Sequence, residues 1–356
     1  MLPEHAYLHG KPEAKGLLRS QMSDFKVFEQ LPFTPMGEGE HLYIKIKKTG
    51  ANTVFVAREL AKYFKVKENL VSYAGLKDRF AVAEQWFGVH VPGKKNYDLS
   101  DLVIDGVEVL EYDRHNKKLR TGALTGNNFE LTLRNVDAVE KLVQRWQEII
   151  THGVPNYFGE QRFGIDGGNI ERALSLFSGA KVKDKKKRGM YLSAARSYIF
   201  NSMINERIKQ SLFDKIIEGD VLMLAGSQSV FHVEGIDSTV NQRLIDKDVD
   251  ITAPMWGAGA LLTTKSALIF EQSVAEQHSE FTQGLPKFGL KQERRRARLN
   301  ISNTDLAILS SENNLVDVKI NFFLPAGCYA TTVLRELLVY QDMTTRVDMR
   351  QVNTEG

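Results

Sequence analysis

Alternation of apolar and polar residues is the strongest constraint on how the first 150 residues of this chain can fold. Four segments alternate with the two-residue period of a half-buried strand: 25–29, 41–47, 107–112 and 129–134. Two further segments, 52–64 and 139–150, repeat their apolar side chains at the spacing of a helix face. Strands interleaved with a few helices favour a sheet covered by helices, and we expect that architecture here.

The ends of these segments suggest where domains begin and end. Asn52 and Asn135 stand where helix N-caps are expected, and Gly153 follows the second helix as a stop signal. Composition changes beyond Gly153, and strand-like alternation resumes only after Leu299. A chain of 356 residues has room for two domains, so we place domain boundaries near these two points. The polar stretch 343–356 is expected to fray.

Asp78 lies in a short glycine-containing loop, Gly75-Leu76-Lys77-Asp78-Arg79, between two apolar runs. The pattern predicts two strands joined by a tight loop that presents this carboxylate. The neighbouring cations Lys77 and Arg79 favour its ionised form, and a loop held by two strands can offer it to a ligand. A solvated turn has the same composition, so the local pattern alone leaves the function open.

Composition excludes several classes of protein. The single cysteine, Cys328, excludes an intramolecular disulfide and a cysteine-rich metal site. No apolar run approaches the ~20 residues of a membrane helix, and the N-terminus lacks the pattern of a signal peptide. We therefore expect a cytoplasmic protein with no membrane association. The chain also lacks a phosphate-binding glycine motif, a pair of histidines at metal-ligand spacing and a Gly-x-Ser-x-Gly elbow.

Basic residues are clustered although the net charge is only +3. The clusters are Lys45, Lys47 and Lys48; Arg114, Lys117, Lys118 and Arg120; 181–188; and Arg294, Arg295, Arg296 and Arg298. A basic cluster is often only a solvated face, but four of them in a nearly neutral chain favour a polyanionic partner. Together with loops rich in aromatic residues, they suit RNA better than duplex DNA.

Six ordered segments resemble the motifs of the TruD family of tRNA pseudouridine synthases. They are Asp24-Phe25-Lys26-Val27-Phe28-Glu29, the segment 75–85 around Asp78, Gly126-Asn127-Asn128-Phe129-Glu130-Leu131, the segment 156–164, Ser193-Ala194-Ala195-Arg196-Ser197 and the segment 324–331. The likeness covers nearly the whole chain. One departure is Ala83, where the family usually has threonine, so a hydroxyl that could brace the loop is absent.

This resemblance implies an α+β fold whose catalytic domain is a mixed sheet flanked by helices. Residues 1–152 and 300–356 would form this discontinuous domain, and 153–299 would form the family's inserted α/β domain. Asp78 then lies in the first part of the catalytic domain and Tyr329 in the second.

The resemblance also implies the reaction, in which uridine becomes pseudouridine, with tRNA as the partner and uridine 13 of the D arm as the target. The bond from N1 to C1′ breaks, the uracil turns, and C5 bonds to the same sugar carbon. Asp78 would attack C1′ or remove the 2′ proton to give a glycal, and the sequence leaves both routes open. Neither route needs a metal or another cofactor. We expect a monomer, and no protein partner is evident.

Further site residues follow from the resemblance alone. Phe129 would be the platform for the flipped base, although by itself it reads as a core phenylalanine. A phenylalanine has no hydroxyl, so the base that removes the C5 proton stays unassigned. Arg19 would pair with Asp78, with an exposed cation as the alternative. The remaining substrate-binding residues are expected to be Phe25, Glu29, Lys77, Asn127, Asn156, Phe158, Gln161, Arg162 and Tyr329.

Two alternatives remain. Asn156, Phe158, Gln161 and Arg162 lie at the expected domain junction, where they would line a cleft or serve only to pack the domains. The whole chain could also be a non-catalytic RNA-binding or RNA-folding protein, or a pseudouridine synthase for another RNA. For the tRNA reading, the runs 181–188 and 294–298 would grip phosphates, and binding would weaken with salt.

Overall fold

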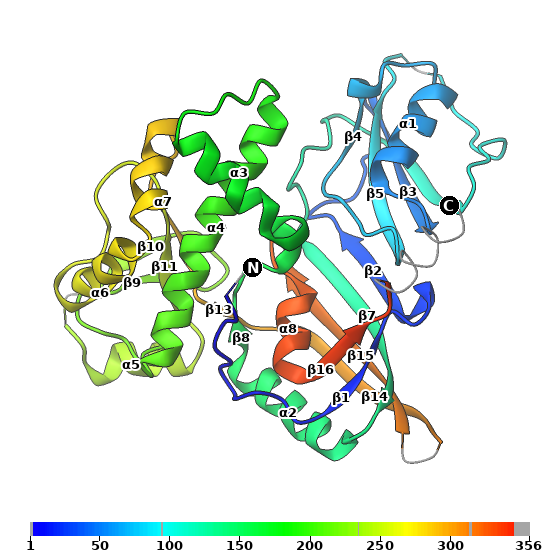
Figure 1. Cartoon of the computed structure of the whole chain (residues 1–356). Coiled ribbons are helices and arrows are strands. Elements are labelled where there is room, and N and C mark those ends of the chain that lie inside the picture. The colour runs from blue at the N-terminus through cyan, green and yellow to red at the C-terminus, as the bar shows by residue number, and fades with distance from the viewer. Residues whose placement is uncertain (1–2, 94, 234, 313–314, 345–356) are drawn as a thin grey trace, which may run out of the picture. The chain divides into compact units, whose positions relative to one another are not determined.

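The computed structural model describes residues 3–93, 95–233, 235–312 and 315–344, and it divides the chain into two compact units (Figure 1). We call the first the sheet unit; it comprises Pro12–Ile150, Ile301–Ala330 and Leu337–Gly356. The second, the helical unit, comprises Met1–Lys11, Thr151–Asn300 and Thr331–Glu336. Most of the polar tail that was expected to fray, 345–356, lies outside the described residues.

Ten strands of the sheet unit form one sheet within the described residues. They are β1 (Lys15–Leu18), β2 (Phe25–Gln30), β3 (His41–Thr49), β4 (Val71–Tyr73), β5 (Val82–His90), β6 (Val107–His115), β7 (Gly126–Val136), β14 (Ser302–Glu312), β15 (Leu315–Pro325) and β16 (Val339–Asp342). The main path runs β14-β15-β7-β2-β5-β3-β6, with β4 on β5 and β1 joining β7 to β16. Because β2 pairs parallel with β5 and β1 with β16 while the other pairs are antiparallel, the sheet is mixed, as expected.

Helix α1 (Thr53–Tyr63) begins as predicted. The Asn52 side chain accepts a hydrogen bond from the Phe55 backbone N–H at 2.7 Å, which satisfies one of the free donors at the helix start. Val56 and Leu60 are fully buried against the apolar face of β3 and β5. This packing places the start of α1 next to the loop that carries Asp78.

Helix α2 (Val139–His152) packs Trp146 against Phe322 of β15, with ring centroids 6.0 Å apart. The expectation that Asn135 caps this helix is wrong. Asn135 lies inside β7 with φ of 54°, because Val136 still pairs with Val316 and extends the strand beyond the polar residue. Strand pairing therefore outweighs the local cap signal. Helix α8 (Ala330–Leu337) follows β15.

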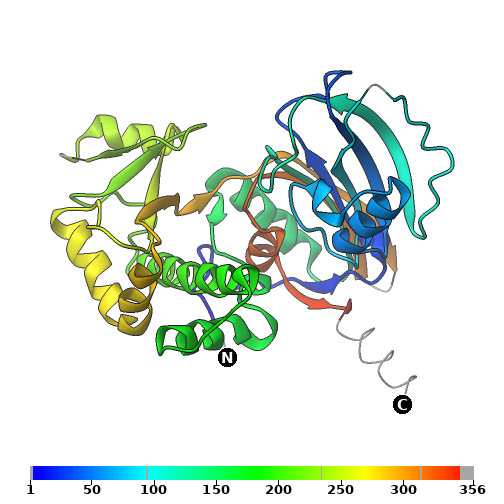
Figure 2. The same cartoon turned by 90° about the horizontal axis from the view of Figure 1, so that it is seen from above.

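The helical unit contains a small sheet and a set of helices, seen from above in Figure 2. The helices are α3 (Gly168–Phe177), α4 (Lys185–Lys209), α5 (Ser238–Ile245), α6 (Lys265–Glu276) and α7 (Ser279–Gly284). The sheet order is β10 (Val230–His232), β9 (Val221–Leu224), β11 (Val249–Met255) and β12 (Glu293–Arg296), and β8 (Val154–Pro155) pairs separately with β13 (Arg298–Leu299). The long helix α4 carries a buried series that includes Ile199, Phe200 and Met203.

Short 3-10 turns complete the secondary structure: Met22–Asp24, Glu68–Leu70, Glu160–Phe163, Ile165–Gly167 and Leu285–Phe288. Among the described residues, no helix is long and apolar enough to cross a membrane.

Candidate active site

Asp78 lies in the loop that joins β4 to β5, which form an antiparallel pair. Its side chain is 33% exposed. One carboxylate oxygen accepts a hydrogen bond from the Arg19 guanidinium at 2.5 Å, and the other accepts one from the Phe80 backbone N–H at 3.0 Å. The carboxylate is thus held in one orientation while part of it stays open to a ligand, as a reacting group requires.

Arg19 follows strand β1 with φ of 58°, in the left-handed region that few side-chain-bearing residues adopt. Its side chain is only 9% exposed and bridges Asp78 to Asp342 of β16. Burial lowers the pKa of this guanidinium, but the two carboxylates outweigh burial and raise it above its usual value. The expected pairing of Arg19 with Asp78 is present, and Asp342 is a partner that the sequence analysis missed.

Lys48, at the end of β3, is a second residue that the sequence analysis missed. It is fully buried, and its ammonium group donates to the backbone oxygens of Ala51 and Asp78, each at 2.7 Å, and of Lys77 at 3.4 Å. An ammonium group has three donors, and here each finds a carbonyl oxygen. Burial lowers the pKa of Lys48 to about 8, which the nearby Asp78 carboxylate only partly offsets.

A buried ion pair between Lys77 and Glu29 also holds the loop that carries Asp78. The Lys77 ammonium lies 2.7 Å from one oxygen of Glu29, and the second oxygen of Glu29 accepts the Trp86 backbone N–H at 3.1 Å. Side-chain exposure is 7% for the lysine and zero for the glutamate. In the sheet unit, Lys77 and Glu29 therefore brace the loop.

Two polar residues complete this support. The Thr53 hydroxyl accepts the Lys77 backbone N–H at 2.9 Å and donates to Gln85 at 2.9 Å. Gln85 in turn donates to the Gly75 carbonyl at 2.5 Å. The loop around Asp78 is thus anchored to α1 and β5 as well as to β3, which makes it a rigid presenter of the carboxylate.

Phe129 lies in the middle of the sheet, on β7, opposite Val27 of β2 and Phe322 of β15. It is 8% exposed, its ring stacks on Phe322 at 5.4 Å, and Phe25 meets it edge-on at 6.1 Å. The Arg19 guanidinium lies 5.3 Å from the Phe25 ring centre. A continuous set of contacts therefore connects the carboxylate to the aromatic cluster. The platform role of Phe129 stays a prediction.

Asn127 lies two residues before Phe129, on the same face of β7, and pairs in register with Glu29. Its side-chain oxygen is buried, with no hydrogen-bond partner among the residues that the structure describes. A buried acceptor of this kind is unfavourable unless a ligand supplies a donor. Tyr329 is half-buried and follows Pro325, which pairs with Gly126 at the same end of β7.

The other predicted site residues belong to the helical unit. The amide of Asn156 bonds Arg295 at 2.7 Å and the Arg296 carbonyl at 2.9 Å. The Phe158 ring lies 4.2 Å below the Arg295 guanidinium. Arg162 donates to Ser193 at 2.8 Å, and Gln161 is exposed. Their role in binding substrate stays a prediction.

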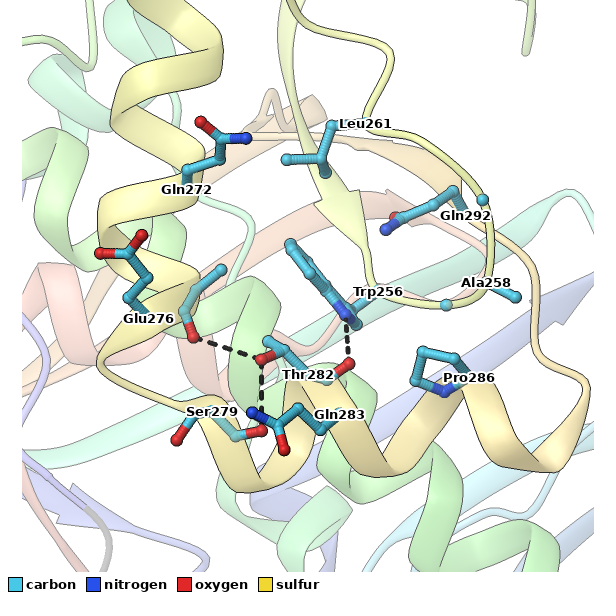
Figure 3. Close-up of a pocket in the computed structure, with 13 residues that line it drawn as sticks. Trp256, Ala258, Leu261, Gln272, Glu276, Ser279, Thr282, Gln283, Pro286 and Gln292 are labelled. Atoms are coloured by element: carbon cyan, nitrogen blue, oxygen red, sulfur yellow. Dashed lines mark hydrogen bonds between the residues drawn. The ribbon is translucent and has the colours of Figure 1, made fainter.

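A cavity of about 630 Å³ lies in the helical unit and contains none of the predicted site residues (Figure 3). Trp256 lines one wall of this cavity, and its indole N–H donates to the Thr282 carbonyl at 3.0 Å. Polar side chains such as Gln272, Gln292 and Glu276 surround the indole. Its lining residues are Trp256, Gly257, Ala258, Gly259, Leu261, Gln272, Ala275, Glu276, Ser279, Thr282, Gln283, Pro286 and Gln292.

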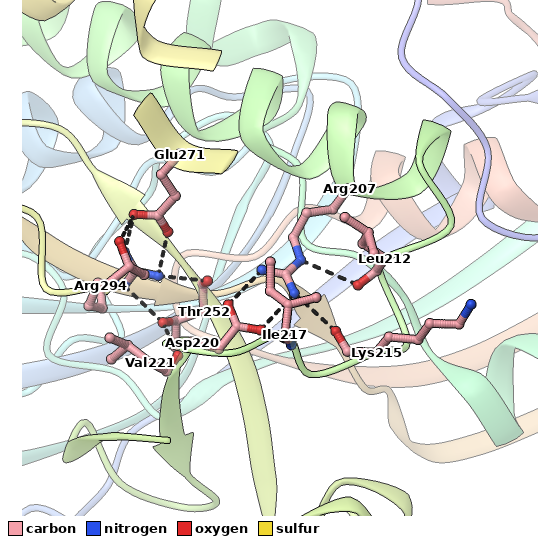
Figure 4. A network of polar contacts seen from close by, with 10 residues as sticks. Arg207, Leu212, Lys215, Ile217, Asp220, Val221, Thr252, Glu271 and Arg294 are labelled. Carbon is pink, nitrogen blue, oxygen red and sulfur yellow. Dashed lines mark hydrogen bonds and ion pairs between the residues drawn. The ribbon is translucent and has the colours of Figure 1, made fainter. Parts of the chain in front are cut away.

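In two of the four basic clusters, the cations contact other groups of the protein. Arg294 pairs with Glu271 at 2.8 Å, deep in the helical unit beside the equally buried pair of Arg207 and Asp220 (Figure 4). The other arginines of that cluster contact Asn156, Asp250 and Asp214 respectively. Likewise Lys45 and Lys47 pair with glutamates while Lys48 is buried. The expectation that the run 294–298 grips phosphates stays a prediction, and the carboxylate partners of Arg294, Arg296 and Arg298 weigh against it.

The family model of tRNA pseudouridine synthase D (TruD) matches residues 2–172 and 166–337. The tRNA pseudouridine synthase D of Colwellia psychrerythraea is 72% identical over 356 residues, which cover 99% of this chain and 97% of the relative. That of Aeromonas hydrophila is 47% identical over 338 residues, covering 95% of each. A solved structure from Methanosarcina mazei, assigned to the same family, superposes with a TM-score of 0.71 at 21% identity, over 94% of this chain and 95% of that one.

The fold and these relatives define a pseudouridine synthase, an isomerase of RNA. The chain belongs to the TruD family, tRNA pseudouridine synthase D. The resemblance of the six motifs, the α+β fold class and the isomerase class are thereby confirmed.

Proposed function

We propose that this chain converts uridine 13 in the D arm of tRNA to pseudouridine, with Asp78 as the nucleophile or the base. The observation that carries this proposal is the carboxylate of Asp78, one-third exposed and held by Arg19 at the end of a braced loop. The full-length relatives named tRNA pseudouridine synthase D support the choice of tRNA. The proposal includes a cytoplasmic location.

The chemistry requires a carboxylate that is ionised and correctly aimed. Asp78 would either form a bond to C1′ as N1 leaves, or take the 2′ proton as N1 leaves to give a glycal. In the first route the freed uracil turns, C5 attacks C1′ and the bond from C1′ to Asp78 breaks. In the second, C5 bonds to C1′ of the glycal and Asp78 returns the proton to C2′. In both routes the C5 proton is then lost to solvent while N1 gains one. The guanidinium of Arg19 keeps Asp78 oriented throughout.

The uracil must leave its stack before it reacts, which costs a few kcal/mol. Phe129 and Phe25 would offer it an apolar surface, and the unpartnered oxygen of Asn127 would accept one of its N–H groups. Tyr329, beyond the end of β15, would close this pocket. We assign the sheet unit to catalysis and the part of the helical unit between 153 and 299 to the inserted domain.

In the helical unit the exposed run 181–188 is the stronger candidate for phosphate contacts. Four cations, Lys185, Lys186, Lys187 and Arg188, occupy the first turn of α4 and are exposed. Cations at a helix N-terminus oppose the helix dipole, so the arrangement weakens the helix in the free protein. A bound polyanion would compensate for that cost.

Release of tritium from C5-labelled uridine in tRNA transcripts tests the proposal. The wild type is expected to release tritium from a transcript with uridine at position 13 and not from one in which cytidine replaces that uridine. Equal release from both transcripts would refute the position. Release only from another RNA would refute tRNA as the substrate, and binding without release from any RNA would favour a non-catalytic RNA-binding protein.

A further inference from the structure

The sheet unit contains a concave surface of about 810 Å³ that holds none of the predicted site residues. We call it the loop groove. It lies along the loop that joins β6 to β7, and its main lining residues are Phe33, Met36, His115, Lys117, Lys118 and Arg120. The proposed reaction uses none of these residues.

The loop beside this groove is fixed at three points. The Tyr43 hydroxyl donates to the Lys117 carbonyl at 3.0 Å, and the Gly122 N–H donates to the Ala74 carbonyl at 2.7 Å. The Thr125 N–H donates to the Gln30 carbonyl at 2.9 Å. Leu119 is buried beneath the loop. The loop therefore presents its cations from a rigid base.

Those cations are exposed and unneutralised. In the part of the chain that the structure describes, neither Lys117 nor Arg120 has a carboxylate partner, and Lys118 reaches only the Asn69 carbonyl, at 3.3 Å. This differs from the clusters at 45–48 and 294–298, where protein groups take up the charges. A surplus of positive charge in a groove attracts phosphates.

The groove also has an aromatic and apolar wall. Phe33 stacks on His115 with centroids 4.6 Å apart and planes inclined by 7°, and both rings contact the buried Tyr43. Met36 is 55% exposed beside them. Cations along a groove with aromatic rings between them are what proteins use to bind unpaired nucleotides.

The loop groove lies near the catalytic loop along the chain. Ala74, which holds Gly122, stands four residues before Asp78, a span of at most about 14 Å even when fully extended. We infer that the loop groove binds the tRNA strand next to the target uridine, with phosphates on Lys117, Lys118 and Arg120 and an unpaired base against Phe33 and Met36. This inference rests on the proposed function.

The test compares two double variants that remove the same charge from the sheet unit. Lys117→Met/Arg120→Met empties the groove of two cations, and the matched control Lys65→Met/Lys67→Met removes two exposed lysines after α1. The Kd for a tRNA transcript is measured at several salt concentrations. The groove variant is expected to bind more weakly and to lower the salt slope by about 0.7–0.9 for each lost phosphate contact, while the control changes less.

A third variant tests the aromatic wall at constant charge. Phe33→Leu keeps an apolar side chain but removes the flat ring, and it is expected to weaken tRNA binding by roughly tenfold, within the range for one stacked base. An unchanged salt slope in the groove variant, or an equal change in the control, would overturn the inference. So would unaltered affinity of Phe33→Leu. These variants are compared by tRNA binding alone. The proposed function has a separate test, since it would be refuted if the wild type released no tritium.

Discussion

The ammonium nitrogen of Lys48 lies 2.7 Å from the backbone oxygen of Asp78. A buried cation on β3 therefore fixes the main chain of the residue whose side chain is proposed to react. The Arg19 guanidinium orients the carboxylate itself, so the two basic residues control different parts of one aspartate. Both controls matter, because small errors in the position of a reacting group reduce the rate strongly.

Lys48→Met is expected to lower kcat by roughly 100-fold, the cost of a misplacement of about 1 Å, and to leave tRNA affinity nearly unchanged. The methionine fills the same space but donates to none of the three carbonyl oxygens. Single-turnover kinetics together with a binding measurement would separate the two effects. Wild-type kcat in this variant would show that the loop does not need the lysine.

The activity should also depend on pH through Lys48. Its pKa is about 8 because of burial, and the neutral amine has one donor too few for its three acceptors. We expect kcat to fall as pH rises through about 8. Lys48→Arg stays charged and should lack this decline. The same decline in Lys48→Arg would assign it to another group.

Stability should follow the opposite trend, which separates loosening of the loop from unfolding. The pKa of Lys48 is lowered from 10.5 to about 8, so between these pH values the unfolded chain binds more protons than the folded one. The contribution of Lys48 to the free energy of unfolding therefore rises with pH in this window. Denaturant titrations of the wild type and Lys48→Arg at about pH 8 and about pH 10, near the two ends of this window, would measure it.

Arg19→Met is expected to lower kcat by about 100-fold, because it leaves Asp78 without the group that orients it. Asp342→Asn should have a smaller effect, since it removes a charge and one acceptor that hold Arg19 but leaves the contact between Arg19 and Asp78 in place. The measurement is kcat for both variants under saturating tRNA. A larger loss for Asp342→Asn than for Arg19→Met would contradict this order of roles.

Two variants of Phe129 would show whether its ring only packs the core or also holds the flipped base. Phe129→Ala should lower the free energy of unfolding by about 3–5 kcal/mol, since the ring packs between Phe25 and Phe322. Phe129→Leu keeps most of the apolar volume and should cost under about 1.5 kcal/mol. If Phe129 is the platform, kcat of the leucine variant should still fall strongly. Near-normal kcat in that variant would leave Phe129 a core residue only.

Arg294 is expected to affect stability rather than tRNA binding. Arg294→Met leaves the carboxylate of Glu271 buried without its partner, and should lower the free energy of unfolding by about 3–5 kcal/mol. The salt slope of tRNA binding, measured where the variant is folded, should stay at the wild-type value. A salt slope lower by the amount of one phosphate contact, about 0.7–0.9, would show that Arg294 binds a phosphate.

The strands and helices of the sheet unit were largely predictable, because their apolar periodicity is clear even where their partners lie far away in sequence. Strand β2 (Phe25–Gln30) and helix α1 with its Asn52 cap lie as predicted. Asn135 shows the limit: a local cap signal yields where pairing with β15 extends β7.

The charges were harder to interpret from sequence. Arg19 meets Asp342, and Arg294 meets Glu271, across separations that no local pattern reveals. Lys48 reads as part of a basic cluster because a buried lysine and an exposed one look alike in sequence. What makes Lys48 different is the set of carbonyl oxygens around it, and only the folded chain assembles them.

Tritium release by Asp78→Asn, compared with the wild type on the same C5-labelled tRNA, tests the central claim most directly. Asparagine has the size of aspartate and can still accept a hydrogen bond from Arg19, but it has no charge with which to attack C1′ or take a proton. We predict release by the wild type only, with tRNA binding retained by the variant. Release by Asp78→Asn at the wild-type rate would contradict the account, because the carboxylate would then play no part in the reaction.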